Sequence, residues 1–155
     1  MSLISALSDT GSNYEDLKYY DTALVYYRKA LVLAQHSKYR MHENTLLLNL
    51  ASLYMHTLQT DSMKYYNEKA LALSSELDLP ENELKANRGM ANYFALKNNL
   101  SEAHKYITRA MDLSEKNSSR EGYALNLGTL SVILVAMHRM KESFRTGETA
   151  GAIHF

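Results

Sequence analysis

The feature that most constrains this chain is a pattern of residue sizes that recurs every 40 positions. Alanine, a second set of small residues and a set of large apolar residues each return at this step. The columns are Ala30, Ala70, Ala110 and Ala150; Gly11, Ala51, Ala91 and Ser131; Tyr14, Tyr54, Phe94 and Leu134; and Leu7, Leu47, Asn87 and Leu127, in which Asn87 is the polar exception. Several columns at one period predict an array of similar units, each of which buries its apolar surface by stacking on its neighbours.

The spacing inside each unit is helical. Leu47, Leu50, Ala51 and Tyr54 lie at i, i+3, i+4 and i+7, which places them on one face of a helix. Residues 58–61 break this pattern, and a second helical stripe follows. Each unit is therefore predicted to be a helix, a short turn and a second helix, in which small residues allow close approach and aromatic rings fill the space beside them. The expected N-cap residues of the second helices are Asp21, Asp61 and Ser101.

The composition agrees with a single all-α domain. The 155 residues include six Gly, one Pro and no Cys, and 46% of them are hydrophobic. Few Gly and Pro residues leave little material for hairpin turns, and the hydrophobic content excludes wholesale disorder. The 17 basic and 17 acidic residues cancel, which argues against a polybasic nucleic-acid-binding or membrane-surface protein. The lack of cysteine excludes disulfides, thiolate zinc sites and cysteine nucleophiles.

These units resemble the tetratricopeptide repeat, whose pattern is W-x2-L-G-x2-Y followed by A-x3-F and a further Ala. The second unit matches it with Leu47-x2-Leu50-Ala51-x2-Tyr54 and then Met63-x3-Asn67-x2-Ala70. No unit has the Trp, and the period is 40 rather than 34, which is similar to the longer repeats of kinesin light chains and of bacterial regulators with tetratricopeptide sensor regions. The resemblance implies a right-handed α-solenoid of about four stacked helix–turn–helix repeats.

A single array is predicted over residues 4–155, with repeats at approximately 4–43, 44–83, 84–123 and 124–155. The extra residues of each repeat, at 38–43, 78–83 and 118–123, are expected to lengthen the second helix or its turn. The fourth repeat matches least well, because Gly147 stands where Tyr27 stands in the first. It also ends before a terminal capping helix, so we expect a fragment of a longer protein, with Met1–Leu3 as an expression remnant.

The first residues lack the charged start and long apolar run of a signal peptide. The longest uncharged run, Gly122–Met137, has 16 residues, fewer than the ~18–20 that a membrane-spanning helix needs, and is predicted to be a buried helix. The compartment stays open: the cytoplasm is the default, and the periplasm applies if the parent chain has a membrane segment.

Motifs for catalysis or metal binding are not evident. The six His residues are scattered and lack the His-Glu-x-x-His spacing, and neither a Gly-rich phosphate loop nor a nucleophile elbow is present. His138 and Glu142 lie four apart, but without a third ligand a solvated helix pair is the preferred interpretation. We therefore expect no enzymatic activity, no metal and no cofactor.

The first helices of stacked pairs line the concave side, so their residues outside the packing stripe face a groove. Along the array this groove is predicted to change from acidic, through amide and hydroxyl side chains, to basic and then apolar. Such a surface suits an extended peptide, because amides pair with its backbone and Lys or Arg can take a carboxylate. The residues predicted to bind a peptide are Asn49, Ser52, His56, Lys85, Arg88 and Asn92.

Co-chaperone members of the family hold a C-terminal carboxylate with a clamp of Lys, Asn and Arg. Asn49 and Lys85 match that clamp in type and place. Asp9 stands where its first Asn belongs, and Gly89 stands where its Arg belongs. These departures argue against that particular specialisation.

The leading hypothesis is a protein–protein interaction module that holds a peptide or protein segment in the groove, as the sensing or scaffolding region of a larger bacterial regulator. The alternative is a homo-oligomerisation scaffold, in its simplest form a homodimer, that works through the apolar fourth repeat. For the apolar face itself, a seam for missing downstream helices is the preferred interpretation, and dimerisation is the second. Neither a nucleic-acid partner nor direct membrane contact is expected. The interface residues of the alternative are Leu125, Val132 and Val135.

Overall fold

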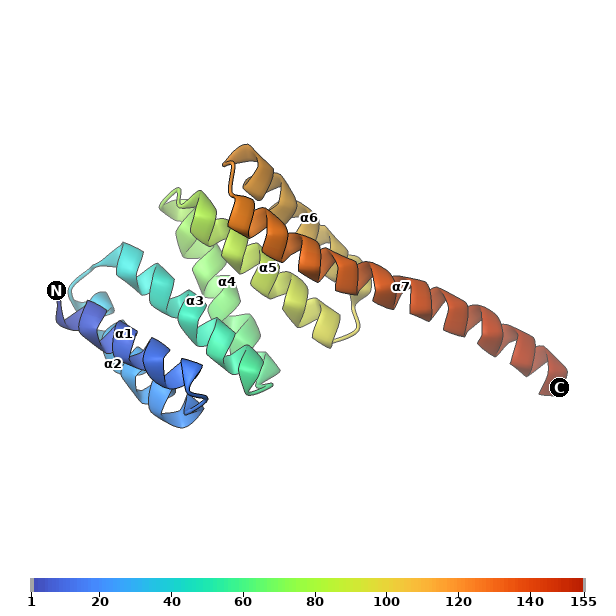
Figure 1. The fold of residues 1–155 in the computed structure, drawn as a ribbon, viewed down its shortest axis with the longest axis horizontal. Coiled ribbons are helices and arrows are strands. Elements are labelled where there is room, and N and C mark those ends of the chain that lie inside the picture. The colour runs from blue at the N-terminus through green and yellow to red at the C-terminus, as the bar shows by residue number, and fades with distance from the viewer. Residues whose placement is uncertain (1, 155) are drawn as a thin grey trace.

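The computed structural model describes the backbone of residues 2–154 and the side chains of residues 2–147. This part of the chain forms seven helices and contains no strand (Figure 1). The helices are α1 (Leu3–Asp16), α2 (Tyr20–His36), α3 (Arg40–His56), α4 (Thr60–Glu76), α5 (Pro80–Leu96), α6 (Leu100–Lys116) and α7 (Arg120–His154).

The helices stack as a solenoid of two layers. Each helix packs against the next one in the chain, and the odd-numbered helices also pack on one another, α1 on α3, α3 on α5 and α5 on α7. A large core joins α1 to α5, and a smaller core that includes Ala91, Ile107 and Ile133 joins α5, α6 and α7. The all-α helical-repeat solenoid predicted from the sequence is confirmed.

The first three pairs use the predicted packing. Gly11 on α1 lies directly against the ring of Tyr27 on α2, and Tyr27 is only 1% exposed. Beside this close approach, one pair of stacked rings joins the two helices of every pair. Their centroids are 5.6 Å apart for Tyr14 and Tyr26, 5.5 Å apart for Tyr54 and Tyr66, and 5.5 Å apart for Phe94 and Tyr106.

All six turns have the same backbone structure. Each is three residues long, and its middle residue has a positive φ of 53–65° although it is not glycine. After α3, the amide of Leu58 donates to the Met55 carbonyl at 3.1 Å, and the amide of Gln59 donates to the Tyr54 carbonyl at 2.9 Å. These bonds satisfy carbonyls that the helix end leaves free, as in a Schellman motif. The middle residues are Lys18, Lys38, Leu58, Asp78, Asn98 and Ser118.

Helix boundaries differ slightly from the prediction. The second helices begin one residue before Asp21, Asp61 and Ser101, so these residues lie in the first turn and are not N-caps. The two aspartates are still favourable there, because the N-terminal end of a helix attracts negative charge. In α6 the cap is Asn99, whose side chain accepts from the Glu102 amide at 3.4 Å. The extra residues 38–43 form part of a turn and the first turn of α3, and do not lengthen α2.

The fourth repeat departs most from the prediction. A second helix was expected to fold back after a turn near residue 138, but α7 runs without interruption from Arg120 to His154 and projects from the body (Figure 1). The helix continues through Met137, His138 and Arg139. At the two positions where the other repeats have the stacked ring pair, the fourth repeat has Leu134 and Thr146. Without that stack, little favours a folded-back helix. The side chain of Ala150, the last member of the alanine column, lies outside the described set.

In the part of the chain described by the structure, no helix combines the length and the hydropathy needed to cross a bilayer.

Candidate binding groove between α3 and α5

A pocket of about 250 Å³ lies between α3 and α5, with α4 as its floor. Five of the six residues predicted to bind a peptide line it, and His56 does not. The lining residues are Leu48, Asn49, Ala51, Ser52 and Met55 from α3, Met63 and Asn67 from α4, and Lys85, Arg88, Gly89 and Asn92 from α5.

Helical spacing brings the polar residues together. Asn49 and Ser52 are three residues apart on α3, and Lys85, Arg88 and Asn92 follow one another at intervals of three and four on α5. Residues at these intervals share a face of a helix. Since α3 and α5 pack side by side, the two polar faces border the same pocket.

The pocket is positively charged although the chain as a whole is neutral. Lys85 and Arg88 line it, and none of its described lining residues is acidic. Burial lowers the pKa of the Arg88 guanidinium, while the Glu81 and Glu121 carboxylates act in the opposite direction. An arginine remains charged at neutral pH even so, and a partly desolvated cation of this kind favours an anionic partner.

Arg88 is held in place from the neighbouring repeat. Its Nη1 donates to Oδ1 of Asn126 on α7 at 3.2 Å, and Asn126 is fully buried. The remaining guanidinium N–H groups are the ones available to the pocket. Asn126 was not among the residues predicted from the sequence, because only the stacking of α7 on α5 brings it there.

Asn67, at the floor of the pocket, was also not among the residues predicted from the sequence. Asn67 on α4 is 2% exposed and occupies the column of Tyr27 and Ile107, where the other two pairs have a large apolar side chain. A polar residue in that column is the signal that could have identified it. A Cβ at Gly89 would overlap the Asn67 amide.

This overlap explains why the carboxylate clamp of the co-chaperone domains is not assembled here. A side chain at position 89 would require Asn67 to move. Asp9, at the other altered position, lines a separate pocket of about 330 Å³ between α1 and α3, together with Ser8 and Thr45. Asn49 and Lys85 therefore meet in the groove without the other two clamp positions.

His56 lies on a different surface. Its ring stacks on Tyr20, with the centroids 5.8 Å apart, and its Nε2 lies 3.9 Å from Oε2 of Glu15. The other oxygen of Glu15 accepts a hydrogen bond from the Tyr27 hydroxyl at 2.8 Å. Burial and this bond raise the pKa of the Tyr27 phenol well above its usual value. His56 thus belongs to the contact between the first two repeats.

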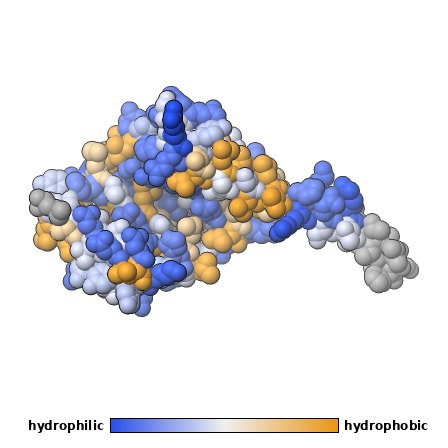
Figure 2. Space-filling model, in the orientation of Figure 1, coloured by the Kyte–Doolittle hydropathy of each residue, from blue (hydrophilic) through white to orange (hydrophobic). Residues whose placement is uncertain are grey.

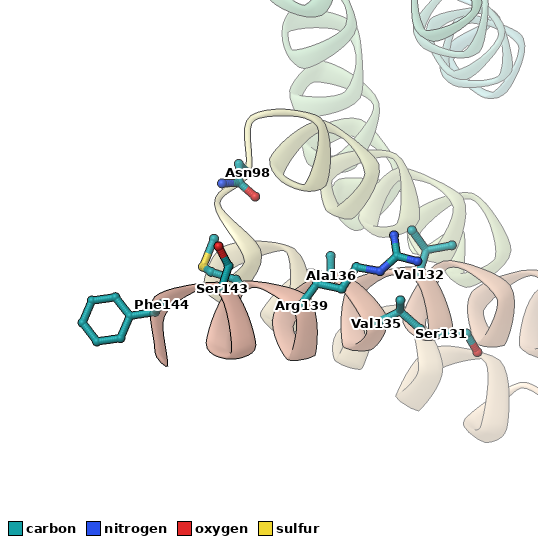
Figure 3. A pocket seen from close by; sticks show the side chains of 9 residues that line it. Asn98, Ser131, Val132, Val135, Ala136, Arg139, Ser143 and Phe144 are labelled. Atoms are coloured by element: carbon teal, nitrogen blue, oxygen red, sulfur yellow. The ribbon is translucent and has the colours of Figure 1, made fainter. Parts of the chain in front are cut away.

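The three residues predicted for an interface are all solvent-exposed. Leu125, Val132 and Val135 are 50%, 65% and 51% exposed. Val132 and Val135 border a pocket of about 900 Å³ on α7 (Figure 3), and Leu125 does not. Among the described residues, no three acidic or histidine side chains are arranged to hold a metal ion.

Solved structures with a similar fold are repeat proteins. BtubC (BKLC) from P. vanneervenii matches 98% of this chain with a TM-score of 0.77 and 15% identity, and this chain spans 63% of it. A kinesin light chain from Podosopora anserina, described as having nearly identical TPR-like repeats, matches 97% of this chain with a TM-score of 0.74 and 13% identity, over 74% of its own length. No protein-family model and no curated protein matches the chain. The shared architecture is the tetratricopeptide-type helical repeat, and that is the fold of this chain.

Proposed function

We propose that this chain is a protein-interaction module that binds an extended acidic peptide segment in the groove between α3 and α5. In this role it serves as the sensing or scaffolding region of a larger bacterial regulator. The observation that carries the proposal is the single pocket in which two cations and three side-chain amides meet without a carboxylate among the described lining residues.

The chemistry of the pocket fits a carboxylate on a peptide. Lys85 and Arg88 can both donate to it, and arginine can do so with two parallel bonds. Asn49 and Asn92 each carry a donor and an acceptor, which match the amide and carbonyl of an extended backbone. Leu48 and Met55 add apolar contact at the edge of the pocket.

The size of the pocket favours a peptide over a small-molecule substrate. Pockets for whole small ligands measure about 300–1,000 Å³, and this one measures about 250 Å³. One acidic side chain or a chain terminus fills such a space, while the rest of the peptide lies along the odd-numbered helices.

Binding of labelled decapeptides, followed by fluorescence anisotropy, tests the proposal. A glutamate-rich peptide is expected to bind, and lysine-rich and Gly-Ser peptides are not. Affinity should fall as salt is added, because exposed charges are screened. Lys85→Ala should weaken binding about tenfold, the size expected for a lost charged hydrogen bond, with no change in melting temperature because Lys85 is exposed.

The matched control is Lys97→Ala, which removes an exposed lysine just beyond α5 and outside the pocket. Its affinity for the glutamate-rich peptide should equal that of the unmodified chain. Equal weakening by both substitutions would mean general attraction to charge, and the groove assignment would fail. Arg88→Ala is a poorer probe, since it also leaves the buried Oδ1 of Asn126 without its donor.

A further inference from the structure

Another pocket lies on the opposite side of the solenoid from the groove between α3 and α5. Figure 2 shows the molecule from the side of the odd-numbered helices, which carry that groove. The other pocket, of about 630 Å³, lies between α4 and α6 with α5 as its floor. Its floor residues Glu83, Asn87 and Met90 lie on the side of α5 opposite Lys85 and Arg88, because successive residues of a helix are turned by about 100°. Within the described residues α4 and α6 do not pack on each other, so a cleft separates them.

Asn87 is a buried polar residue at the floor of this pocket. It is 3% exposed, and the same column holds Leu7, Leu47 and Leu127 in the other repeats. Its Nδ2 donates to the Glu83 carbonyl of its own helix at 3.0 Å, but no group in the described part of the chain donates to its Oδ1. A buried acceptor without a donor costs stability. The missing donor is one that a ligand in the pocket can bring.

The charge that lines the pocket is mainly negative. Glu68, Glu83 and Asp112 face one cation, Arg109, among the described lining residues. Lys64 lies 3.6 Å from Glu68 and partly neutralises it. In the part of the chain that the structure describes, Glu83 and Asp112 form no ion pair. These two carboxylates are therefore available to a cation from outside.

The rest of the lining is largely apolar or aromatic. Leu71, Met90 and Leu113 contribute hydrocarbon surface from the three helices. The Arg109 guanidinium lies over the ring of Tyr106 on its own helix, 5.2 Å from the ring centroid. This contact holds the cation by an attraction other than an ion pair. The pocket thus combines acceptors and negative charge with a hydrocarbon wall.

The equivalent cleft one repeat earlier, between α2 and α4, has a different chemistry. An arginine stands there in place of a glutamate, a leucine in place of the buried amide, and an alanine in place of an aspartate. That arginine is itself occupied, since it donates to the Tyr54 hydroxyl at 2.8 Å. The stacking of repeats therefore does not require acceptors at these positions, and their presence is particular to the cleft between α4 and α6. The column pairs are Arg28 and Glu68, Leu47 and Asn87, and Ala72 and Asp112.

We propose that the pocket between α4 and α6 binds the primary ammonium group of an aliphatic amine. An ammonium group has three donors and no acceptor, which suits the Asn87 Oδ1 together with the carboxylates of Glu83 and Asp112. The hydrocarbon chain of the amine packs on the apolar wall. Because Oδ1 is covered in this structure, binding includes a shift of the flexible Met90 side chain, which shares its face of α5. The volume lies within the ~300–1,000 Å³ of small-ligand pockets.

NMR titration of the isotope-labelled full chain with diaminopentane tests the proposal. The side-chain amide signal of Asn87 should shift, and the affinity should exceed that for pentanediol, which has the same chain length without charge, by at least about tenfold. N-acetyl-lysine amide, titrated in parallel, distinguishes a lysine side chain of a protein from a free amine as the source of the ammonium group. Tighter binding of either amine supports the proposal and identifies its source. Equal affinity for the diol and both amines overturns it.

Asn87→Leu separates binding from folding. It should weaken binding of diaminopentane about tenfold, the size expected for a lost hydrogen bond to a charged group, while the free energy of unfolding rises. Its affinity for the glutamate-rich peptide should not change, so failure of this proposal is distinguishable from failure of the peptide groove. Unchanged affinity for the diamine would exclude Asn87 from the site and overturn the proposal.

Glu83→Gln tests the carboxylate, and Glu43→Gln is its matched control. Glu43 stands at the same position of the preceding repeat and is half-buried like Glu83, but it lies outside the pocket. Glu83→Gln should weaken binding of diaminopentane about tenfold, and Glu43→Gln should leave it unchanged. Equal weakening by both substitutions would show general attraction of the amine to negative charge and would overturn the site.

Discussion

The contact between Gly11 and Tyr27 sets how closely α1 and α2 approach. A Cβ at position 11 would lie 2.7 Å from two ring atoms, and Tyr27 is buried and hydrogen-bonded to Glu15. Gly11→Ala is therefore expected to lower the free energy of unfolding by about 1–3 kcal/mol, the usual cost of overpacking, as measured by urea denaturation. Gly128→Ala is the control, because no neighbouring atom lies within 4 Å there; it should stabilise the chain by up to ~1 kcal/mol. Similar losses from both would contradict the packing argument.

Tyr27 makes the fold sensitive to alkaline pH. Its pKa is raised in the folded chain by burial and by the hydrogen bond to Glu15, whereas in the unfolded chain the phenol ionises near pH 10. The contribution of Tyr27 to stability is thus complete below about pH 10 and is lost as the pH rises further. Denaturation of the unmodified chain and of Tyr27→Phe between pH 8 and 11 should give curves that converge with rising pH. The two proteins differ only at residue 27, so parallel curves would show that Tyr27 has no such role.

At the scale of one element, Asn87, the polar residue in a column of leucines, is expected to lower the free energy of unfolding. Asn87 on α5 is 3% exposed; its Nδ2 donates to the Glu83 carbonyl, but its Oδ1 is buried without a partner. An unpaired buried acceptor costs about 1–3 kcal/mol. Asn87→Leu restores the column and should raise the free energy of unfolding by about 1–2 kcal/mol.

The matched control is Asn44→Leu, the same change at a fully satisfied site on α3. The Asn44 Nδ2 donates to the Ala70 carbonyl at 2.8 Å, and its Oδ1 accepts from Asn82 at 2.6 Å. This substitution should destabilise the chain, because it removes both bonds and leaves Asn82 unpaired. A gain in stability from both variants, measured in the same urea titrations, would show that burial alone decides the sign.

The helix pairs were predictable because packing acts directly on side-chain size. Gly11 opposite Tyr27, and the stacked rings of Tyr54 and Tyr66, are visible as columns in the sequence. The turns were not predictable in the same way. Their left-handed residues include Lys38 and Leu58, so no glycine marks them, and backbone hydrogen bonds alone decide where each helix ends.

The groove and α7 were likewise predictable only in part from the sequence. Helical phase identified five of the residues that line one pocket, but the bond from Arg88 to Asn126 and the stacking of His56 on Tyr20 depend on contacts between repeats. The continuity of α7 had a readable signal. Leu134 and Thr146 replace the ring pair of the other units, and with that pair gone the hydrophobic columns alone do not require a second helix.

For the whole molecule, local stability should follow the number of neighbours that each helix has. The α3 and α5 helices each pack on two helices of their own layer and two of the other layer, whereas the C-terminal part of α7 projects from the stack (Figure 1). Amide hydrogen exchange is therefore expected to be slowest in α3 and α5 and fastest in the last described residues of α7, 144–147. Exchange in α5 as fast as in that segment would contradict the expected order.

The uniform turns have a consequence for how such an array changes length. From α2 to α6 every helix occupies 17 residues and every connection three, so cutting the chain at two equivalent connections leaves ends with the same direction and rotation. Duplication or loss of a 40-residue block at those points would join without repair of the neighbouring cores. An ancestral gene could thus gain or shed binding surface in whole steps, while each new copy remained free to acquire its own recognition chemistry.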